Sequence, residues 1–356
     1  AVLFAPRQGL PGPSREEPSR AVLWLFRLLL FRLVFSSAVV KLAGGDPTWR
    51  NLTALQYHYE TQPLPTPIGW FAHQLPSWFQ SFSAVGMFGI ELVIPFFLFA
   101  PRQLRFLAAL LIAFFQVLIA LTGNYAYFSL LTLTLCVLAL DDAFLRDVLP
   151  RRFVEKVVGA APAKRDSRFR RALMGAVATL ITLAGITQVA GLVLGQQKLP
   201  RPALELLARL GQFHIVSGYG LFAVMTTSRP EIVVEGSNDG QTWLAYEFKY
   251  KPGDVKRPPP VVAPHQPRLD WQMWFAALGD YRNSPWFVNF MVRLLEGSPE
   301  VLALLEKNPF PNAPPRFIRA SRYDYHFTDF PGRRTSGAWW RRRFTGPYFP
   351  VASLRK

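Results

Sequence analysis

The sequence predicts an α-helical polytopic membrane domain followed by a β-rich, sandwich-like domain with short appended helices. Half of the 356 residues are hydrophobic and only 18% are charged, which is less charge than a soluble globular protein usually carries. Long apolar runs occupy the first 195 positions, and short alternating stretches with turn signals follow. We therefore expect a remnant of a truncated N-terminal region at 1–20, a transmembrane domain at 21–195 and an extracytoplasmic domain at 196–356.

Five apolar segments approach the length that crosses the hydrocarbon core, about 17–25 helical residues. The fourth is marginal unless its helix continues into residues 143–145. The predicted spans are 21–43, 82–100, 104–121, 126–140 and 172–194.

Basic connections orient these spans. The turn 101–105 and the connection 141–171 are rich in Lys and Arg, and such an excess marks cytoplasmic loops. The loop 44–81, the turn 123–125 and everything after residue 194 are then predicted to lie on the opposite side. This alternation is consistent over all five spans.

The formal net charge of +17 has a lipid explanation. The basic residues flank apolar spans, where anionic headgroups attract them, and no nucleic-acid-binding motif accompanies them. We therefore predict the lipid bilayer as a partner and no nucleic acid. The single cysteine, Cys136, excludes an internal disulfide and a cysteine-based metal site.

Motifs of catalysis are missing from the sequence. The histidines at 73, 214, 265 and 326 have no metal-ligand spacing, and no Walker A, GxGxxG or GxSxG motif occurs. We accordingly predict no catalytic residue, no cofactor and no metal.

The region after residue 200 predicts short strands. We expect strands within 213–225 and 231–250, the latter with a hairpin at 238–240, where Asn, Asp and Gly favour a tight turn. Two helices are predicted at 284–297 and 298–307, because each begins with Ser followed by Pro.

The loop 52–67, LTALQYHYETQPLPTP, concentrates polar side chains between two apolar spans. Its Tyr57, His58 and Glu60 are candidate functional residues, because a histidine near a carboxylate can carry out acid–base chemistry. The alternative is a hydrogen-bonded loop packed on the outer domain. We favour the structural alternative, since the loop supplies too few further ligands.

Arg32 and Glu91 each lie near the middle of a predicted span. A charge at that depth costs roughly 3 kcal/mol or more unless it is paired. We hypothesise a buried ion pair between Arg32 and Glu91. The alternative is that each finds another polar partner or water.

Aromatic residues are candidates for contact with a client or with the membrane interface, since Trp and Arg are frequent in both. Some of these must instead belong to the core. The candidates are Trp271, Trp274, Trp286, Phe287, Trp339 and Trp340. Asn51 begins an Asn-Leu-Thr glycosylation sequon in the loop predicted to face away from the cytoplasm.

Several long blocks of sequence resemble the lipase maturation factor family. They are LTALQYHYETQPLPTP, FAPRQLR, TGNYAYFSLLTL, the pair Asp141-Asp142, GLFAVMTTSRPEIVVEGSNDGQTW, RLDWQMWFAALG and SPWFVNFMVRLLEGSPEVLALLEKNPFP. The resemblance as a whole covers about residues 20–330.

This resemblance implies a membrane protein that assists the folding and assembly of dimeric lipases such as lipoprotein lipase. It implies the endoplasmic reticulum membrane in animals, or the inner or plasma membrane in a bacterium, with the C-terminal domain engaging the client. The leading prediction is thus a non-enzymatic folding or assembly factor with a lipase-like protein client. The alternative is an integral-membrane enzyme acting on lipid or protein, with Tyr57, His58, Glu60, Arg32 and Glu91 at the outer mouth of the helices. A transporter is disfavoured because inverted repeats are not evident.

Overall fold

The computed structural model describes residues 19–150 and 168–354, apart from positions 214, 215, 217, 219 and 221. The predicted N-terminal remnant and much of the predicted cytoplasmic connection 141–171 lie outside the described residues. The chain forms two compact units. The helical unit comprises the described residues of Ala1–Asn51, Ser83–Gln116 and Leu130–Val224, and the sheet unit comprises those of Leu52–Phe82, Val117–Ser129 and Met225–Lys356.

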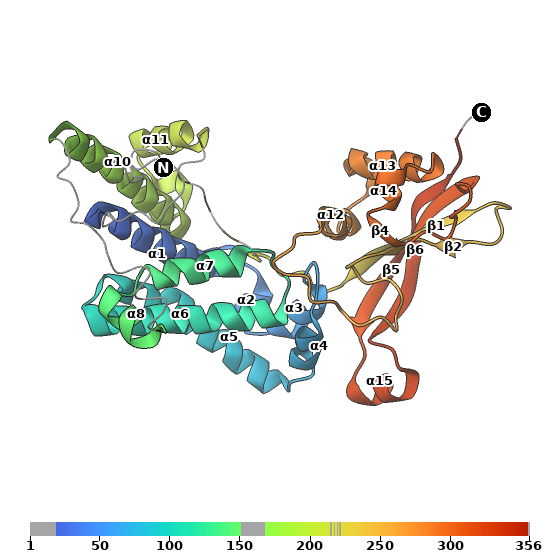
Figure 1. Cartoon of the computed structure of the whole chain (residues 1–356), viewed down its shortest axis with the longest axis horizontal. Helices are drawn as coiled ribbons and strands as arrows, with labels where there is room; N and C mark the ends of the chain where they lie inside the picture. The colour runs from blue at the N-terminus through green and yellow to red at the C-terminus, as the bar shows by residue number, and fades with distance from the viewer. Residues whose placement is uncertain are drawn as a thin grey trace. The chain divides into compact units, whose positions relative to one another are not determined.

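The helical unit contains the predicted apolar spans (Figure 1). Four helical segments among the described residues are long and apolar enough to cross a membrane, and a fifth qualifies if one bent helix pair is a single span. The prediction of about five spans is confirmed at this level. The elements are α1 (Arg20–Ala43), α2 (Pro47–Arg50), α5 (Ser77–Leu92) with η2 (Ile94–Phe99), α6 (Arg102–Thr122), α7 (Phe128–Val137), α8 (Asp142–Val148), α10 (Arg168–Leu194), η3 (Gln196–Lys198) and α11 (Arg201–Gly211).

The fourth apolar segment does not continue as one straight helix. The 10-residue α7 is about 15 Å long, half of the roughly 30 Å hydrocarbon thickness. The chain then bends by 110° into α8. Asp141 explains the break, because its carboxylate accepts a hydrogen bond from the Phe144 amide and thereby begins a new helix. The Asp141 carboxylate also pairs with Arg102 at 2.5 Å.

Close packing between α1, η2, α6 and α7 forms the core of the helical unit. The buried residues of this core are Leu30, Val34, Leu98, Ala108, Ala109, Ile112, Cys136 and Ala139. The burial of Cys136 is consistent with its place in an apolar run.

The sheet unit consists of antiparallel sheets and short helices, as predicted. A four-stranded sheet has the order β2-β1-β5-β6, and β3 pairs with β4 in a second sheet. Its elements are α3 (Leu55–Thr61), α4 (Pro67–His73), β1 (Pro230–Ser237), β2 (Leu244–Ala245), β3 (Glu247–Phe248), α12 (Arg268–Ala277), η4 (Tyr281–Asn283), α13 (Pro285–Leu295), α14 (Pro299–Leu302), β4 (Leu305–Lys307), β5 (Phe317–Phe327), α15 (Phe330–Ser336) and β6 (Trp340–Ala352).

Helices cover one face of the larger sheet. Ile232 and Val234 of β1 and Ile318 of β5 pack against Met273 of α12 and Phe287 of α13. Figure 1 shows α12 and α13 on the same side of the strands. The layer packed on this face of the sheet is therefore helical, where a sandwich would have a second sheet.

The predicted hairpin is present between β1 and β2, with Glu235 opposite Ala245. Its turn is stabilised by Asp239, whose carboxylate accepts hydrogen bonds from two backbone amides and the Ser237 hydroxyl. These bonds lower the pKa of Asp239. Gly240 takes the left-handed conformation, with φ +74°, which glycine adopts readily.

Two local predictions were wrong. The described residues of 213–225 form turns and loop, without a strand. The helix predicted at 298–307 ends at Leu302, and residues 305–307 form β4. Pairing of Leu305 with Phe248 overrides the helical signal of the Ser-Pro start.

Candidate functional site

The loop 52–67 folds as helix α3 followed by a buried extended segment. Gln62 ends the helix with extended backbone geometry, and the closely spaced prolines after it cannot continue a helix. Thr66 then begins α4, because its hydroxyl accepts a hydrogen bond from the Gly69 amide. Residues 60–66 are all buried. Their backbone polar groups therefore need partners within the protein.

Arg229 supplies three of these partners. Its guanidinium, fully buried, donates to the carbonyl oxygen of Glu60 at 2.7 Å, to that of Pro63 at 3.0 Å and to that of Gln62. The side chain extends from the residue that precedes β1. One arginine thus fixes the extended segment to the sheet.

Acidic and basic side chains surround Arg229. Glu231 lies 2.8 Å from the Arg229 guanidinium and 2.9 Å from the Lys251 ammonium. Lys251 also donates to the carbonyls of Ile232 and Pro252. Burial lowers the pKa of Arg229, and the nearby Glu231 charge opposes this effect. Arginine remains charged in such surroundings, so the bonds to Glu231 and the carbonyls are charge-assisted.

Both carboxylate oxygens of Glu60 contact β5. Oε1 lies 3.1 Å from Nδ1 of His326, and Oε2 accepts a hydrogen bond of 2.9 Å from the Phe327 amide. Nε2 of His73 lies 3.7 Å from Oε2. The other ring nitrogen of His326, Nε2, lies 3.1 Å from Oδ2 of Asp324. Glu60 is therefore occupied in joining α3 to the sheet.

The surroundings of His73 lower the pKa of its imidazole. Burial lowers its pKa, the Glu60 charge opposes this, and His326 and Arg341 add to the lowering. The neutral imidazole is accordingly the favoured form in the folded protein.

His58 belongs to a separate hydrogen-bonded group. Its Nε2 lies 3.0 Å from the hydroxyl of Tyr125, which donates to Oε1 of Gln62 at 2.7 Å. Gln62 in turn donates to the carbonyls of Tyr59 and Thr122. Tyr57 is half-buried, and its carbonyl accepts from the Thr61 hydroxyl. The structure thus separates His58 and Glu60 into two groups of contacts.

Asn124, which the sequence did not single out, connects three segments. Its amide nitrogen donates to the carbonyls of Leu64 and Pro260, and its oxygen accepts from the amides of Val262 and Ala263. The only signal in the sequence was the Gly-Asn-Tyr turn at 123–125. That pattern predicts a tight turn, but it does not indicate that Asn124 forms hydrogen bonds with residues 260–263.

The hypothesised Arg32–Glu91 pair was wrong. Glu91 pairs with Lys41 at 2.7 Å, and Arg32 donates to Gln188. The helical repeat explains why Lys41, and not Arg32, is the partner of Glu91. Lys41 continues the buried stripe of Leu30, Val34 and Ala38 on α1, whereas Arg32 is two residues, about 200°, away from Val34. Because α1 is apolar on nearly all sides, its buried face became visible only in the structure.

The five candidate tryptophans are mostly structural. Trp274 and Trp340 are buried, so the prediction that they offer a contact surface was wrong. Trp274 donates to the Thr61 carbonyl at 2.9 Å and so also holds the loop. Trp271, Trp286 and Trp339 are half-buried, and Phe287 is in the core. Asn51 is exposed at the end of α2, and its glycosylation stays a prediction.

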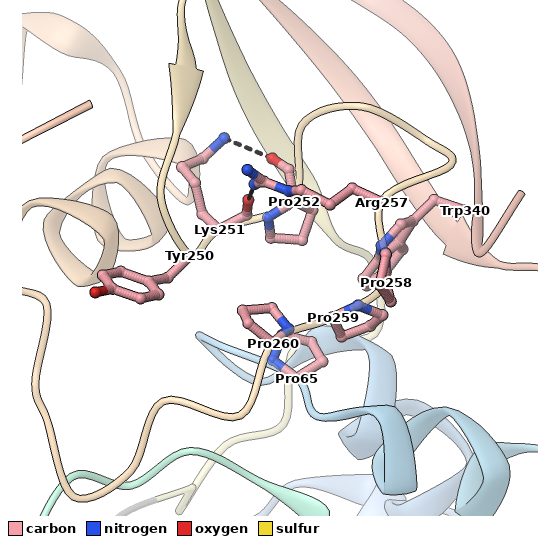
Figure 2. A pocket seen from close by; sticks show the side chains of 9 residues that line it. All are labelled: Pro65, Tyr250, Lys251, Pro252, Arg257, Pro258, Pro259, Pro260 and Trp340. Carbon is pink, nitrogen blue, oxygen red and sulfur yellow. Dashed lines mark hydrogen bonds between the residues drawn. The ribbon is translucent and has the colours of Figure 1, made fainter. Parts of the chain in front are cut away.

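A small void lies beside the anchored loop (Figure 2). It measures about 10 Å³, roughly the space for one water molecule. Figure 2 shows Pro65 and Pro260 facing the segment that carries Tyr250 and Lys251. Within the described residues, no group of three or more His, Cys, Asp or Glu side chains is arranged to hold a metal ion.

Comparison with known proteins identifies the family. A model of the lipase maturation factor transmembrane domain matches residues 1–147, and a model of the lipase maturation factor C-terminal domain matches residues 215–350. This chain belongs to the lipase maturation factor family. Together with the apolar helices, this membership identifies an integral membrane protein.

Individual lipase maturation factors align with nearly the whole chain. Lipase maturation factor 2 from Mus musculus and from Homo sapiens are each 37% identical over 99% of this chain and 64% of the relative. Lipase maturation factor 1 from Homo sapiens is 34% identical over 97% of this chain and 63% of the relative. The chain therefore spans less than two thirds of the length of these relatives. No solved structure gave a significant match.

The Lys41–Glu91 pair predicts a measurable asymmetry between single and double variants. Lys41→Met leaves a buried carboxylate without its partner and should lower the free energy of unfolding by about 3–5 kcal/mol. The double variant Lys41→Met/Glu91→Leu should recover most of this loss, because no buried charge remains. Thermal unfolding in detergent micelles measures the stability of the single and the double variant. Leu42→Met, at an exposed neighbouring residue, is the control. A double variant as unstable as the single one would contradict the pairing.

Arg229→Met should destabilise the sheet unit by about 3–5 kcal/mol, because Glu231 and three carbonyls lose a buried cationic donor. The released loop should also become susceptible to proteolysis within residues 60–66. Arg282→Met is the matched control, since the Arg282 side chain is 75% exposed, and should stay within about 0.5 kcal/mol of wild type. Protection of the loop in Arg229→Met would refute the anchoring role.

Acidification should destabilise the sheet unit through His73. Its folded pKa lies below the unfolded value of about 6.5, so the unfolded state binds the proton more readily. The contribution is fully present above about pH 6.5 and is lost as pH falls toward the folded pKa. Thermal midpoints measured between about pH 5 and about pH 8 should show a shallower acid-side decline in His73→Gln. The control His265→Gln should retain the wild-type slope, and equal slopes in all three proteins would contradict the assignment.

Proposed function

We propose that this chain acts as a membrane-bound maturation factor for lipases or other secreted proteins, without enzymatic activity of its own. The observation that carries the proposal is the similarity of nearly the whole chain to proteins named lipase maturation factors. In a eukaryote the endoplasmic reticulum membrane is the proposed location, and in a bacterium the inner or plasma membrane. The part after residue 195 would face away from the cytoplasm, as the basic connections predict.

The contacts of the loop 52–67 support this function over the alternative of an integral-membrane enzyme. An acid–base pair would need His58 and Glu60 to converge on a substrate. Instead, Glu60 holds the Phe327 amide and His326, and His58 contacts Tyr125. These side chains serve the folding of the sheet unit, which leaves client contact to its outer surface.

The surface of β5 and β6 offers a place for an apolar client segment. A shallow groove of about 280 Å³ lies there. Register shifts between the two strands disturb the pleat along this stretch, and the edge position of β6 leaves one side of the strand uncovered. The groove is lined by Arg319, Ala320, Ser321, Tyr323, Phe344, Pro347, Phe349, Pro350 and Val351.

An unfolded lipase is the occupant we propose for this groove. Its apolar segments, which the native enzyme buries, could contact the exposed Phe344 and Val351. Exposed apolar surface of this kind marks protein-interaction sites. Three arginines at 341–343 and two prolines in β6 disfavour pairing of further strands along the edge. We therefore expect side-chain contact across the groove rather than strand addition.

The test is co-expression of the intact protein with a secreted dimeric lipase in cells that lack their own maturation factor. Phe344→Asp should reduce both secreted lipase activity and co-purified lipase by roughly 5–30-fold, the loss expected for about 1–2 kcal/mol of contact energy. Phe275→Asp adds the same charge at another exposed phenylalanine, on α12, and should leave both unchanged.

The two levels of the proposal fail separately. Wild-type protein that leaves lipase activity at the level of empty cells would overturn the maturation function. Normal activity with Phe344→Asp, at equal protein abundance, would overturn only the client groove.

A further inference from the structure

The segment that leads into the second candidate span presents large apolar side chains to the outside. Helix α4 buries Gly69 and Trp70 on one face and exposes Ile68 and Phe71 on another. The exposed series continues through the turn and into the start of α5. Its members are Leu75, Trp78, Phe79 and Phe82, of which Trp78 is 69% and Phe82 67% exposed.

Helix α15 extends this apolar surface. The Phe330 ring lies 5.1 Å from Trp70 and 6.2 Å from Phe71, measured between ring centres, and Phe330 is itself exposed. Gln74 donates to the Thr328 carbonyl, which ties the end of α4 to the chain just before α15. Residues far apart in the sequence therefore form one surface.

The start of α5 is firmly attached to α4. The amide of Gln80, which is buried, donates to the carbonyls of His73 at 3.1 Å and Leu75 at 3.1 Å. The surface formed by α4, the turn 74–76, residues 77–82 and α15, here called the platform, is thus continuous with the candidate span Ser77–Phe99. That continuity identifies its occupant, because a span of this kind is embedded in lipid.

Basic side chains lie on the platform next to the apolar ones. The Arg333 guanidinium lies 3.5 Å from the centre of the Trp339 ring and 5.0 Å from that of Trp70. Arg334, beside it on α15, is exposed. The one acidic residue at this helix is Asp329, whose carboxylate caps the helix by accepting a hydrogen bond from the Gly332 amide. Aromatic rings at headgroup depth beside guanidiniums match a membrane interface.

We propose that the platform is a lipid-binding surface that rests in the headgroup region of the bilayer at the point where α5 enters it. Phe71, Leu75 and Phe330 contact the boundary between headgroups and acyl chains, at the depth typical of interfacial helices. Arg334 binds lipid phosphate, so anionic phospholipid strengthens the contact. The surface would fix one face of the sheet unit on the membrane, independently of any client.

The experiment uses the full chain in nanodiscs that hold one copy each. An environment-sensitive fluorophore is attached at Leu75→Cys or Phe330→Cys in a Cys136→Ala background, with Gln241→Cys in the exposed hairpin turn as control. Nitroxide-labelled lipids should quench the first two labels severalfold more than the control label. Quenching as weak as that of the control would overturn the proposal, as would quenching that requires two copies per disc.

Lipid charge tests the phosphate contact. With the label at Phe330→Cys, quenching should be greater in discs containing phosphatidylglycerol than in pure phosphatidylcholine. Adding Arg334→Gln should abolish this difference while leaving the quenching in phosphatidylcholine unchanged. Equal quenching in the two lipids before and after that substitution would overturn the assignment of Arg334 to phosphate.

Discussion

The fold of the sheet unit depends on the buried Arg229 guanidinium. A segment such as 60–66 carries backbone carbonyls that water can no longer solvate, and each unpaired group would cost about 1–3 kcal/mol. Arg229 satisfies three of them from a single position and is itself neutralised by Glu231. Trp274 donates to the carbonyl of Thr61, between two of these acceptors, and Asn124 donates to that of Leu64, which follows them. The polar character of the loop is therefore explained by its burial.

Similar contacts give the cluster of histidines and carboxylates a structural role. Asp324, His326, Glu60 and His73 lie in succession, which on its own resembles the beginning of a catalytic constellation. The Phe327 amide, however, donates to Glu60 within this group, so both carboxylate oxygens of Glu60 are already engaged by β5. Charge and hydrogen bonding here specify how α3 meets β5. The cost is a dependence on the protonation of His73, whose neutral form the burial favours.

Much of the architecture was predictable because it depends on local signals. Apolar length indicated the spans, and Asn-Asp-Gly indicated the β1–β2 hairpin. The partners of the buried charges were harder to predict from the sequence. Arg32 and Lys41 both lie in an apolar span, and the sequence does not distinguish which of them faces Glu91. Nor does any sequence pattern relate Arg229 to carbonyls some 170 positions earlier. Likewise, the tryptophans suggested a contact surface by composition alone. Which of them are buried depends on how β5, β6 and α12 pack.

The positions of these hydrogen-bond partners in the sequence determine which part of the chain could fold on its own. Asn124, Tyr125 and Glu60 come from segments that lie between apolar helices in the sequence, yet they belong to the sheet unit. Residues 225–356 alone would retain Arg229 without its three carbonyl acceptors and β5 without Glu60. A buried cation without acceptors is strongly unfavourable. The sheet unit therefore depends for its folding on the loops 52–82 and 117–129, and helix insertion and folding of the C-terminal part are physically coupled.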